Sequence, residues 1–228
     1  MAELIRKEQQ PEGFVIYTDY QLGGKGQRGN IWSSENGKNI LMSVLLRPRR
    51  LDMQDQYLLN IIAALAVLDL LGTIISPGKE VKVKWPNDVF VEGKKICGIL
   101  VENSVRGKSL ESSIVGIGLN VNQQGFNQAR ATSLFLETGS NYDREFIMEV
   151  LLSRFEKWYL KLNSGQKDEI VDRYHENLLW KGELRTYKAN GEDFVGTIKG
   201  INGSGQLMID RESGERNVYN VKEVSFQH

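Results

Sequence analysis

The segment Gln21-Leu-Gly-Gly-Lys-Gly-Gln-Arg-Gly-Asn-Ile-Trp32 restricts the fold of this chain more than any other stretch. It combines four glycines with two cations and a tryptophan. Glycine lets the backbone adopt positive φ and bring its N–H groups close to a ligand, while Lys25 and Arg28 can neutralise negative charge. The composition indicates an anion-binding loop, and a flexible surface loop between two strands is the alternative that this segment leaves open.

The spacing Gly24-x-Gly26-x-x-Gly29 also matches the dinucleotide-binding fingerprint, which requires a strand before it and an apolar helix directly after it. The run Phe14-Val-Ile-Tyr-Thr18 supplies the strand. Residues 30–39 are polar and rich in turn formers, and they lack a helical period. The sequence therefore argues against a doubly wound dinucleotide-binding fold.

Composition excludes several classes of partner. Lysine plus arginine equals aspartate plus glutamate at 29 each, so no overall positive field would hold nucleic acid. The single cysteine, Cys97, excludes an internal disulfide and is expected to be a buried residue in a reducing compartment. No secretory signal opens the chain, and the apolar run at 61–68 is far shorter than the roughly 20 residues that span a bilayer. A cytoplasmic protein with no membrane partner is expected.

The middle of the chain predicts helices packed on a sheet. Strand composition marks residues 40–46, 81–84, 95–102 and 112–121, the third reached through a hairpin at 88–93, and these predict one mixed or mostly antiparallel sheet. Helical periodicity predicts helices from Asp52 to about Leu71, where Gly72 would stop the first, at 143–163, and from Lys167 to about Leu179. Two apolar stripes are expected in the core: Leu58, Ile61, Ile62, Leu65 and Leu68 on the first helix, and Phe146, Val150, Leu151, Phe155, Trp158 and Leu162 on the second.

After Lys181 the pattern changes to short strands separated by glycine turns, at 183–187, 194–200, 205–210 and 217–221. Such a pattern in a short segment is typical of a small β-barrel. The expected architecture is α+β, with residues 1–181 forming the larger domain and residues 182–228 forming the barrel.

Three further segments carry candidate site residues. The turn Lys84-Trp-Pro-Asn-Asp88 would fix Lys84 and the Asn87 amide at the mouth of a cleft, although a plain turn explains the same residues. Lys95 begins an apolar strand, where it would be a fixed cation or extend to solvent. In Gly116-Ile-Gly-Leu-Asn-Val-Asn122 the glycines would let a ligand or a neighbouring strand approach, and Asn120 would contact a polar edge.

The chain has only two histidines, His175 and His228, so no zinc cluster or Ser-His-Asp triad is expected. Cations, amides and backbone groups must then supply the chemistry. This set suits phosphoryl or nucleotidyl transfer, in which positioning and charge neutralisation dominate.

Taken in order, the glycine-rich segment at 21–32, Lys84-Trp-Pro-Asn-Asp88, Lys95-Ile-Cys-Gly-Ile-Leu-Val-Glu102 and Gly116-Ile-Gly-Leu-Asn-Val-Asn122 resemble the biotin protein ligases. The resemblance covers nearly the whole chain, including Ala131-Thr-Ser-Leu134 and the C-terminal barrel. It implies a class II synthetase-like catalytic domain followed by an SH3-like barrel. It also implies an enzyme that makes biotinyl-5′-AMP from biotin and ATP with Mg²⁺, then biotinylates a lysine of a biotin carboxyl carrier domain. Homodimers are common in this family.

The resemblance also assigns roles to residues. Lys95 would be the catalytic lysine, with Arg28 and Lys25 as supporting cations. The residues expected around biotin are Gln21, Gly24, Lys25, Gly26, Gln27, Trp32, Lys95, Gly98, Leu100 and Gly116. The residues expected around the nucleotide are Arg28, Gly29, Asn30, Trp32, Lys84, Asn87 and Asn120, with no metal ligand among the protein side chains.

The chain departs from the family pattern in three places. Many members have arginine at the positions of Gln27 and Asn30, so two cations on the phosphate side are missing. The usual Ser/Thr-Thr-Asn motif before the first helix has no counterpart here, and there is no N-terminal helix-turn-helix, so a repressor function is not implied. A lipoate or octanoate ligase or transferase on the same fold, and a catalytically weak biotin-binding protein, are the alternatives.

Overall fold

The computed structural model describes residues 10–26, 31–107, 109–127 and 130–227 of the chain. Its larger sheet has six strands, and every neighbouring pair is antiparallel. In spatial order the strands are β1 (Val15–Thr18), β4 (Ile40–Leu46), β8 (Ser109–Leu119), β7 (Lys94–Arg106), β6 (Asp88–Val91) and β5 (Val81–Lys84). The predicted α+β class is confirmed, and the glycine-rich segment does not lead into a helix.

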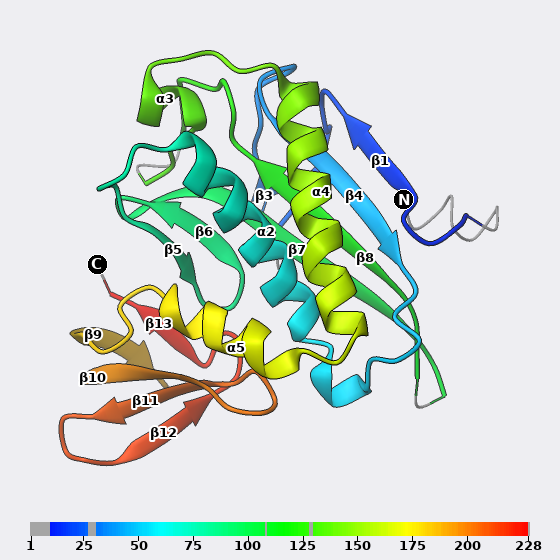
Figure 1. Ribbon diagram of the computed structural model, residues 1–228. Coiled ribbons are helices and arrows are strands. Elements are labelled where there is room, and N and C mark those ends of the chain that lie inside the picture. Colours follow the sequence, from blue (N-terminus) through cyan, green and yellow to red (C-terminus); the bar gives the residue numbers. More distant parts are fainter. Residues whose placement is uncertain (1–9, 27–30, 108, 128–129, 228) are drawn as a thin grey trace.

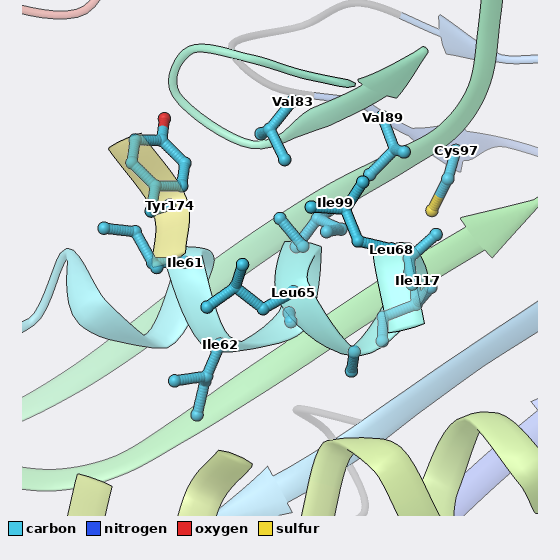
Figure 2. Packing of buried hydrophobic residues seen from close by; sticks show 14 of the residues in the cluster. Ile61, Ile62, Leu65, Leu68, Val83, Val89, Cys97, Ile99, Ile117 and Tyr174 are labelled. Carbon is cyan, nitrogen blue, oxygen red and sulfur yellow. The ribbon is translucent and has the colours of Figure 1, made fainter. Parts of the chain in front are cut away.

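Helices cover one face of this sheet (Figure 1). The helical elements are η2 (Met53–Asp55), α2 (Leu58–Ile74), the short α3 (Leu134–Thr138), α4 (Arg144–Asn163) and α5 (Lys167–Glu176). Ile61, Leu65 and Leu68 of α2 are buried in the main core, and Figure 2 shows this helix beside Ile99 and Ile117 of the sheet. All five core residues predicted on this helix are confirmed as buried.

The segment Met53–Ile74 is long and apolar enough to cross a membrane by length and composition alone. It is 67% buried inside the protein, however, and α2 packs between the sheet and the helices α4 and α5. A helix that is apolar on all sides and covered on all sides is typical of the centre of a protein core.

Several details of the predicted helices are wrong. The first α-helix begins at Leu58 and not at Asp52, and the last ends at Glu176 and not near Leu179. The first helix does not stop at Gly72 but continues to Ile74, because Gly72 lies at an exposed position where nothing crowds it, and Ile75 turns to an extended conformation ahead of Pro77. Phe146 is 62% exposed, and Ile147 takes the buried position in the first turn of α4. The rest of the predicted stripe is confirmed: Val150 is half-buried, and Leu151, Phe155, Trp158 and Leu162 are buried.

The predicted hairpin at 88–93 also needs correction. Asp88–Val91 is itself a strand, and the reversal is confined to Glu92 and Gly93, which both have positive φ. The run Val89-Phe-Val91, made of residues that favour strands, pairs with β5 on one side and β7 on the other. This additional strand places Asp88 opposite Lys84.

The C-terminal strands form a second antiparallel sheet. In spatial order they are β12 (Arg216–Tyr219), β11 (Leu207–Arg211), β10 (Glu192–Ile201), β9 (Leu184–Ala189) and β13 (Val224–Phe226). A bridge between Val221 and Val224 joins the ends of the two outer strands, as expected for a small barrel. The change from helices to short strands after Lys181 is therefore where the sequence predicted it.

The barrel is attached to the larger domain through specific hydrogen bonds. The Trp85 indole N–H donates to the Gly205 carbonyl at 3.0 Å, and the Ile201 N–H donates to Nε2 of His175 at 2.9 Å. A tryptophan in the turn after β5 is explained by this contact, because a large ring there anchors a second domain.

Candidate active site

The central strands present alternate residues to opposite faces of the sheet. Cys97 and Ile99 of β7 and Ile117 of β8 are buried on the face toward α2 (Figure 2). The residues that alternate with them along the two strands face away from the helices. The register pairs Gly98 with Gly118 and Leu100 with Gly116. These four residues, which we call the glycine floor, are Gly98, Leu100, Gly116 and Gly118. The floor brings together three residues predicted to line the biotin pocket.

The Trp32 indole lies directly on the glycine floor. A Cβ atom built on Gly98 would be 2.8 Å from Cζ3 of Trp32, and one built on Gly118 would be 2.7 Å from Cε2. Side-chain atoms do not approach this closely, so both positions require glycine because a ring crosses them. The indole N–H is buried and has no hydrogen-bond partner within the described part of the chain.

The glycine-rich segment forms a small hairpin that carries Trp32 to this position. Its strands are β2 (Gly24–Lys25) and β3 (Ile31–Trp32), with Gly24 opposite Trp32. A Cβ on Gly24 would lie 2.3 Å from the Trp32 carbonyl oxygen, so glycine is needed for the two strands to approach. Gly116 is different, because its nearest neighbour would lie 3.4 Å away, at the edge of ordinary contact.

The Lys95 side chain runs over the floor beside this ring. Its Cε atom would lie 3.3 Å from a Cβ on Gly98, and its Nζ atom is 5.6 Å from the centre of the Trp32 ring. The same Nζ forms a salt bridge of 2.6 Å with Oδ2 of Asp88. The side chains of this pair are 27% and 32% exposed, so a ligand on the floor can reach the ammonium group.

Two more cations lie close to this pair: Lys84 beside Asp88, and Arg130 close enough to act on Lys84. Lys84 lies opposite Asp88 in the β5–β6 register, and its Nζ is 5.5 Å from the centre of the Phe90 ring. Burial lowers the pKa of Lys84, the charge of Asp88 opposes this, and the charges of Lys95 and Arg130 lower the pKa further. We call Lys84, Lys95 and Arg130 the cation cluster, because the charges of Lys95 and Arg130 both act on Lys84 and Lys95 is paired with Asp88.

The loop that precedes α3 supports both Lys95 and Asn120. The Lys95 N–H donates to the carbonyl of Arg130 at 2.8 Å, and the Thr132 N–H donates to the carbonyl of Lys95 at 2.9 Å. The Asn120 amide N–H₂ donates to the Thr132 carbonyl at 2.9 Å. The opposite end of that amide, Oδ1, is buried and has no partner among the residues that the structure describes. Asn120 therefore keeps a fixed, unused acceptor.

Asn87 lies elsewhere than at the floor. It is almost completely buried, and its amide N–H₂ donates to Oδ1 of Asn60 and to the carbonyl of Ile99, both at 2.8 Å. These bonds fix the turn between β5 and β6 against α2. Both N–H donors of the Asn87 amide are used inside the protein. The predicted contact of Asn87 with a nucleotide is not tested by these bonds and stays a prediction.

Several predicted site residues cannot be placed. Gln27, Arg28, Gly29 and Asn30 lie outside the described residues, as does the side chain of Lys25. Gln21 is exposed, and its Oε1 would lie 2.9 Å from a Cβ on Gly24; Gly26 follows β2. Gln21 thus precedes the hairpin that carries Trp32, and Gly26 lies within it, directly after β2.

The sequence reading missed Asp88, Arg130 and Thr132 as site residues. A signal for Asp88 existed, because a hairpin turn at 85–87 places residues 84 and 88 opposite each other. No pattern distinguished Arg130 or Thr132, because their position depends on a long-range pairing with Lys95. Across the described ranges no three His, Cys, Asp or Glu side chains gather as metal ligands would.

Comparison with known proteins shows the family to which this chain belongs. Residues 1–120 match the Biotin/lipoate A/B protein ligase family. The chain is 32% identical to the bifunctional ligase/repressor BirA of Bacillus spizizenii, over 96% of this chain and 68% of that protein. It is also 32% identical to the biotin--[acetyl-CoA-carboxylase] ligase of Paracoccus denitrificans, over 90% of this chain and 87% of that protein.

The fold agrees with the sequence. The biotin protein ligase of Aquifex aeolicus, solved in complex with biotin and ATP, superimposes with a TM-score of 0.82 at 28% identity, covering 99% of this chain and 94% of that one. Fold and site define an enzyme of the biotin and lipoate ligase class. Within that class the chain belongs to the biotin protein ligases.

Proposed function

We propose that this enzyme joins biotin to ATP to form biotinyl-5′-AMP and then transfers the biotinyl group to a lysine of a biotin carboxyl carrier domain. In the first step a carboxylate oxygen of biotin bonds to the α-phosphorus of ATP, and pyrophosphate leaves. In the second, the acceptor amine bonds to the acyl carbon, loses a proton and releases AMP. The observation that carries the proposal is Lys95, held at the edge of the glycine floor by Asp88.

The first step requires two negative groups to meet. At about 4 Å two unit charges repel by roughly 4 kcal/mol at an effective dielectric constant near 20. Lys95 would contact both the carboxylate and the α-phosphate, while Lys84 would lie on the phosphate side of the cation cluster. Fixed cations act most strongly on charge that is shared in the transition state, so the cluster would raise the rate of adenylation.

The floor and its surroundings offer places for the two substrates. Biotin would lie over the Leu100–Gly116 pair, because the Trp32 ring already covers Gly98 and Gly118. Gln21, Gly24 and Gly26 would border the biotin from the hairpin, and Trp32 would separate it from water. Excluding water protects the mixed anhydride from hydrolysis until the acceptor lysine arrives.

Asn120 supports an adenine nucleotide as the second substrate. Its Oδ1 is a buried acceptor without a partner in the described part of the protein, and the exocyclic amine of adenine is a donor of the required kind. A buried polar atom that is satisfied only when the ligand binds contributes to selectivity. Arg28, Gly29 and Asn30, which lie outside the described residues, would contact the phosphates as the family resemblance implies.

Mg²⁺ would enter with ATP. The described residues provide Asp88 as the acidic side chain of the cation cluster, and it is paired with Lys95. Magnesium in nucleotide sites commonly takes most of its oxygen ligands from phosphates and water. The residues present fit an ion held mainly by ATP, whose charge the ion would reduce.

The proposed acceptor is a carrier domain of a biotin-dependent carboxylase. The enzyme would meet this acceptor in the cytoplasm, and neither nucleic acid nor a membrane would be a partner. Residues 1–181 would form the catalytic domain and residues 182–228 the barrel.

Two copies of the protein would pair along β1, which is an outer strand of the sheet and carries the exposed Tyr17. Light scattering on the purified protein measures that state, and a monomer at micromolar concentration would contradict pairing.

ATP–pyrophosphate exchange tests the proposed function, because it needs no acceptor protein. We expect exchange that depends on biotin and on Mg²⁺, with no exchange when lipoate or octanoate replaces biotin. Exchange with lipoate or octanoate but not with biotin would show that the substrate is one of those acids and not biotin. Biotin binding without any exchange would reduce the protein to a biotin-binding protein, and the proposal would be wrong.

A further inference from the structure

One aromatic ring connects the C-terminal barrel to the cation cluster. Phe226, at the end of β13, places its ring centre 4.9 Å from Nζ of Lys84. In Figure 1 the last strand, β13, lies on the side of the barrel that faces β5, the strand that ends in Lys84. The ammonium group of Lys84 therefore lies over two aromatic rings, Phe90 of the larger domain and Phe226 of the barrel.

Two aromatic rings pack against Phe226: Trp180, just before the barrel begins, and Tyr187 within the barrel. The Phe226 ring centre is 5.4 Å from that of Trp180 and 5.5 Å from that of Tyr187, the latter in an edge-to-face arrangement. Tyr187 is fully buried in the barrel core. Aromatic rings packed in this way have little freedom to move, so the face that Phe226 presents to Lys84 is fixed.

The barrel itself is held against the larger domain on the same side. The turn that follows Lys84 contains Trp85, whose N–H donates to Gly205 of the barrel at 3.0 Å. Backbone bridges add to this: Val83, next to Lys84, pairs with Leu178, and Lys181 pairs with Ile198 of the barrel. The distance between Phe226 and Lys84 is therefore set by the docking of the two domains.

We propose that Phe226 is a positioning residue for adenylation, acting through Lys84 on the phosphates of ATP. This inference rests on the proposed function, in which Lys84 contacts the nucleotide. A cation on an aromatic face is attracted by the ring and loses part of its water shell. Lys84 would then meet the phosphates already oriented, and less free energy would be spent on ordering a long flexible side chain.

The test compares two phenylalanines of the barrel. Phe226→Leu removes the ring at Lys84, while Phe194→Leu is the matched control. Phe194 also packs on Tyr187, at 5.7 Å, but the cation over it is Arg211, 4.3 Å away, and not Lys84. We expect Phe226→Leu to raise the KM for ATP in biotin-dependent exchange by about threefold to thirtyfold, the range for loss of a cation–π contact. The KM for biotin should not change, and Phe226→Tyr should restore the wild-type value.

A double-mutant cycle decides whether Phe226 acts through Lys84. If it does, adding Phe226→Leu to Lys84→Ala will not raise the KM for ATP further. Additive effects, an equal effect of Phe194→Leu, or an equal rise in the KM for biotin would each overturn the inference. Should Phe226→Leu unfold the barrel, as seen by thermal melting, Phe226→Met replaces it because it keeps the volume and removes the π face.

A binding measurement separates this inference from the proposed function. The affinity for a non-hydrolysable ATP analogue, measured by calorimetry with biotin present, should fall in Phe226→Leu by the same factor as the KM rises. Unchanged affinity would overturn the inference, even if the enzyme is active. Absence of biotin-dependent exchange in the wild-type protein would instead overturn the proposed function.

Discussion

The two faces of β7 and β8 differ in what their residues contribute. Toward α2 the strands carry Cys97, Ile99 and Ile117, each buried and in contact with the helical layer. Burial also raises the pKa of the Cys97 thiol, so that this side chain stays protonated and inert. On the opposite face the same strands carry the glycine floor, with a tryptophan ring and a lysine over it.

The difference shows how one pair of strands can be both core and site. Side chains on one face bury apolar area and stabilise the fold, whereas their absence on the other face exposes backbone that a ring or a substrate can approach closely. Because successive residues alternate between faces, neighbouring substitutions should change different properties. Three predictions test this contrast, and a fourth, with the smallest expected effect, concerns the docking of the barrel.

Lys95→Ala should cause the largest change in activity. Removing a fixed cation from a site where charge is shared typically costs about 10²- to 10³-fold in rate, and we expect biotin-dependent exchange to fall by that factor. The thermal midpoint should change little, because the Lys95–Asp88 pair is partly exposed. Lys94→Ala, which removes an exposed lysine next to it, is the control and should keep full exchange. Equal losses in the two variants would contradict a special role for Lys95.

Ile117→Ala should instead affect stability. The side chain is 2% exposed and belongs to the main core, and truncating such an isoleucine costs about 2–5 kcal/mol of unfolding free energy. Urea unfolding measures this change. Below the onset of unfolding, the KM values for biotin and ATP should stay within about twofold, as expected for a residue that faces away from the site. A large change in either KM at unchanged stability would contradict the separation of the two faces.

Gly118→Ala tests the next residue along the strand, on the other face. The added methyl would lie 2.7 Å from Cε2 of Trp32, so the ring must move. Displacing a group by about 1 Å near reacting atoms can cost up to about 10²-fold, and we expect exchange to fall about ten- to hundredfold. Gly72→Ala adds the same methyl on α2 where nothing lies within 4 Å, and it should stabilise the protein by up to about 1 kcal/mol without loss of exchange. If Gly118→Ala kept full activity, the contact of Trp32 with the floor would have no role in catalysis.

The sequence predicted the helix-facing half of this comparison well. Alternation and helical periodicity depend on local spacing, so strands 40–46 and 81–84 and the burial of Leu65 and Cys97 could be predicted without knowing the tertiary structure. The errors occurred where local signals were misleading. Gly72 is a usual helix terminator, yet the helix passes through it, because the turn toward Pro77 decides the end.

The site face was harder to predict. The glycines at 116 and 118 could be noted as unusual in a strand, but no local pattern indicated that the Trp32 ring crosses Gly98 and Gly118. The approach of Arg130 to Lys84 and the use of Asn87 donors inside the core depend on contacts between segments far apart in the chain. Such contacts have no periodicity, and only the assembled fold defines them.

The smallest expected effect concerns His175, which lies on neither face and joins α5 to the barrel. Its Nε2 accepts the Ile201 N–H, and burial, aided by the charge of Lys181 and opposed by Asp172, lowers the pKa of His175 below 6.5. The native state therefore binds a proton less readily than the unfolded state, so stability is complete above pH 6.5 and falls as the pH drops below it.

Because solvent screens this partly exposed ring, we expect a loss below about 1 kcal/mol between pH 7.5 and 5.5. Urea unfolding at the two pH values measures it, and His175→Gln, which keeps an acceptor but does not titrate, should remove that part of the pH dependence. An identical pH dependence in the variant would show that other groups cause it. At pH 7.5 the His175→Gln variant should keep wild-type KM values, because the His175 contact only docks the barrel and contributes to stability. Phe226 differs, because it is also proposed to position Lys84 at the nucleotide.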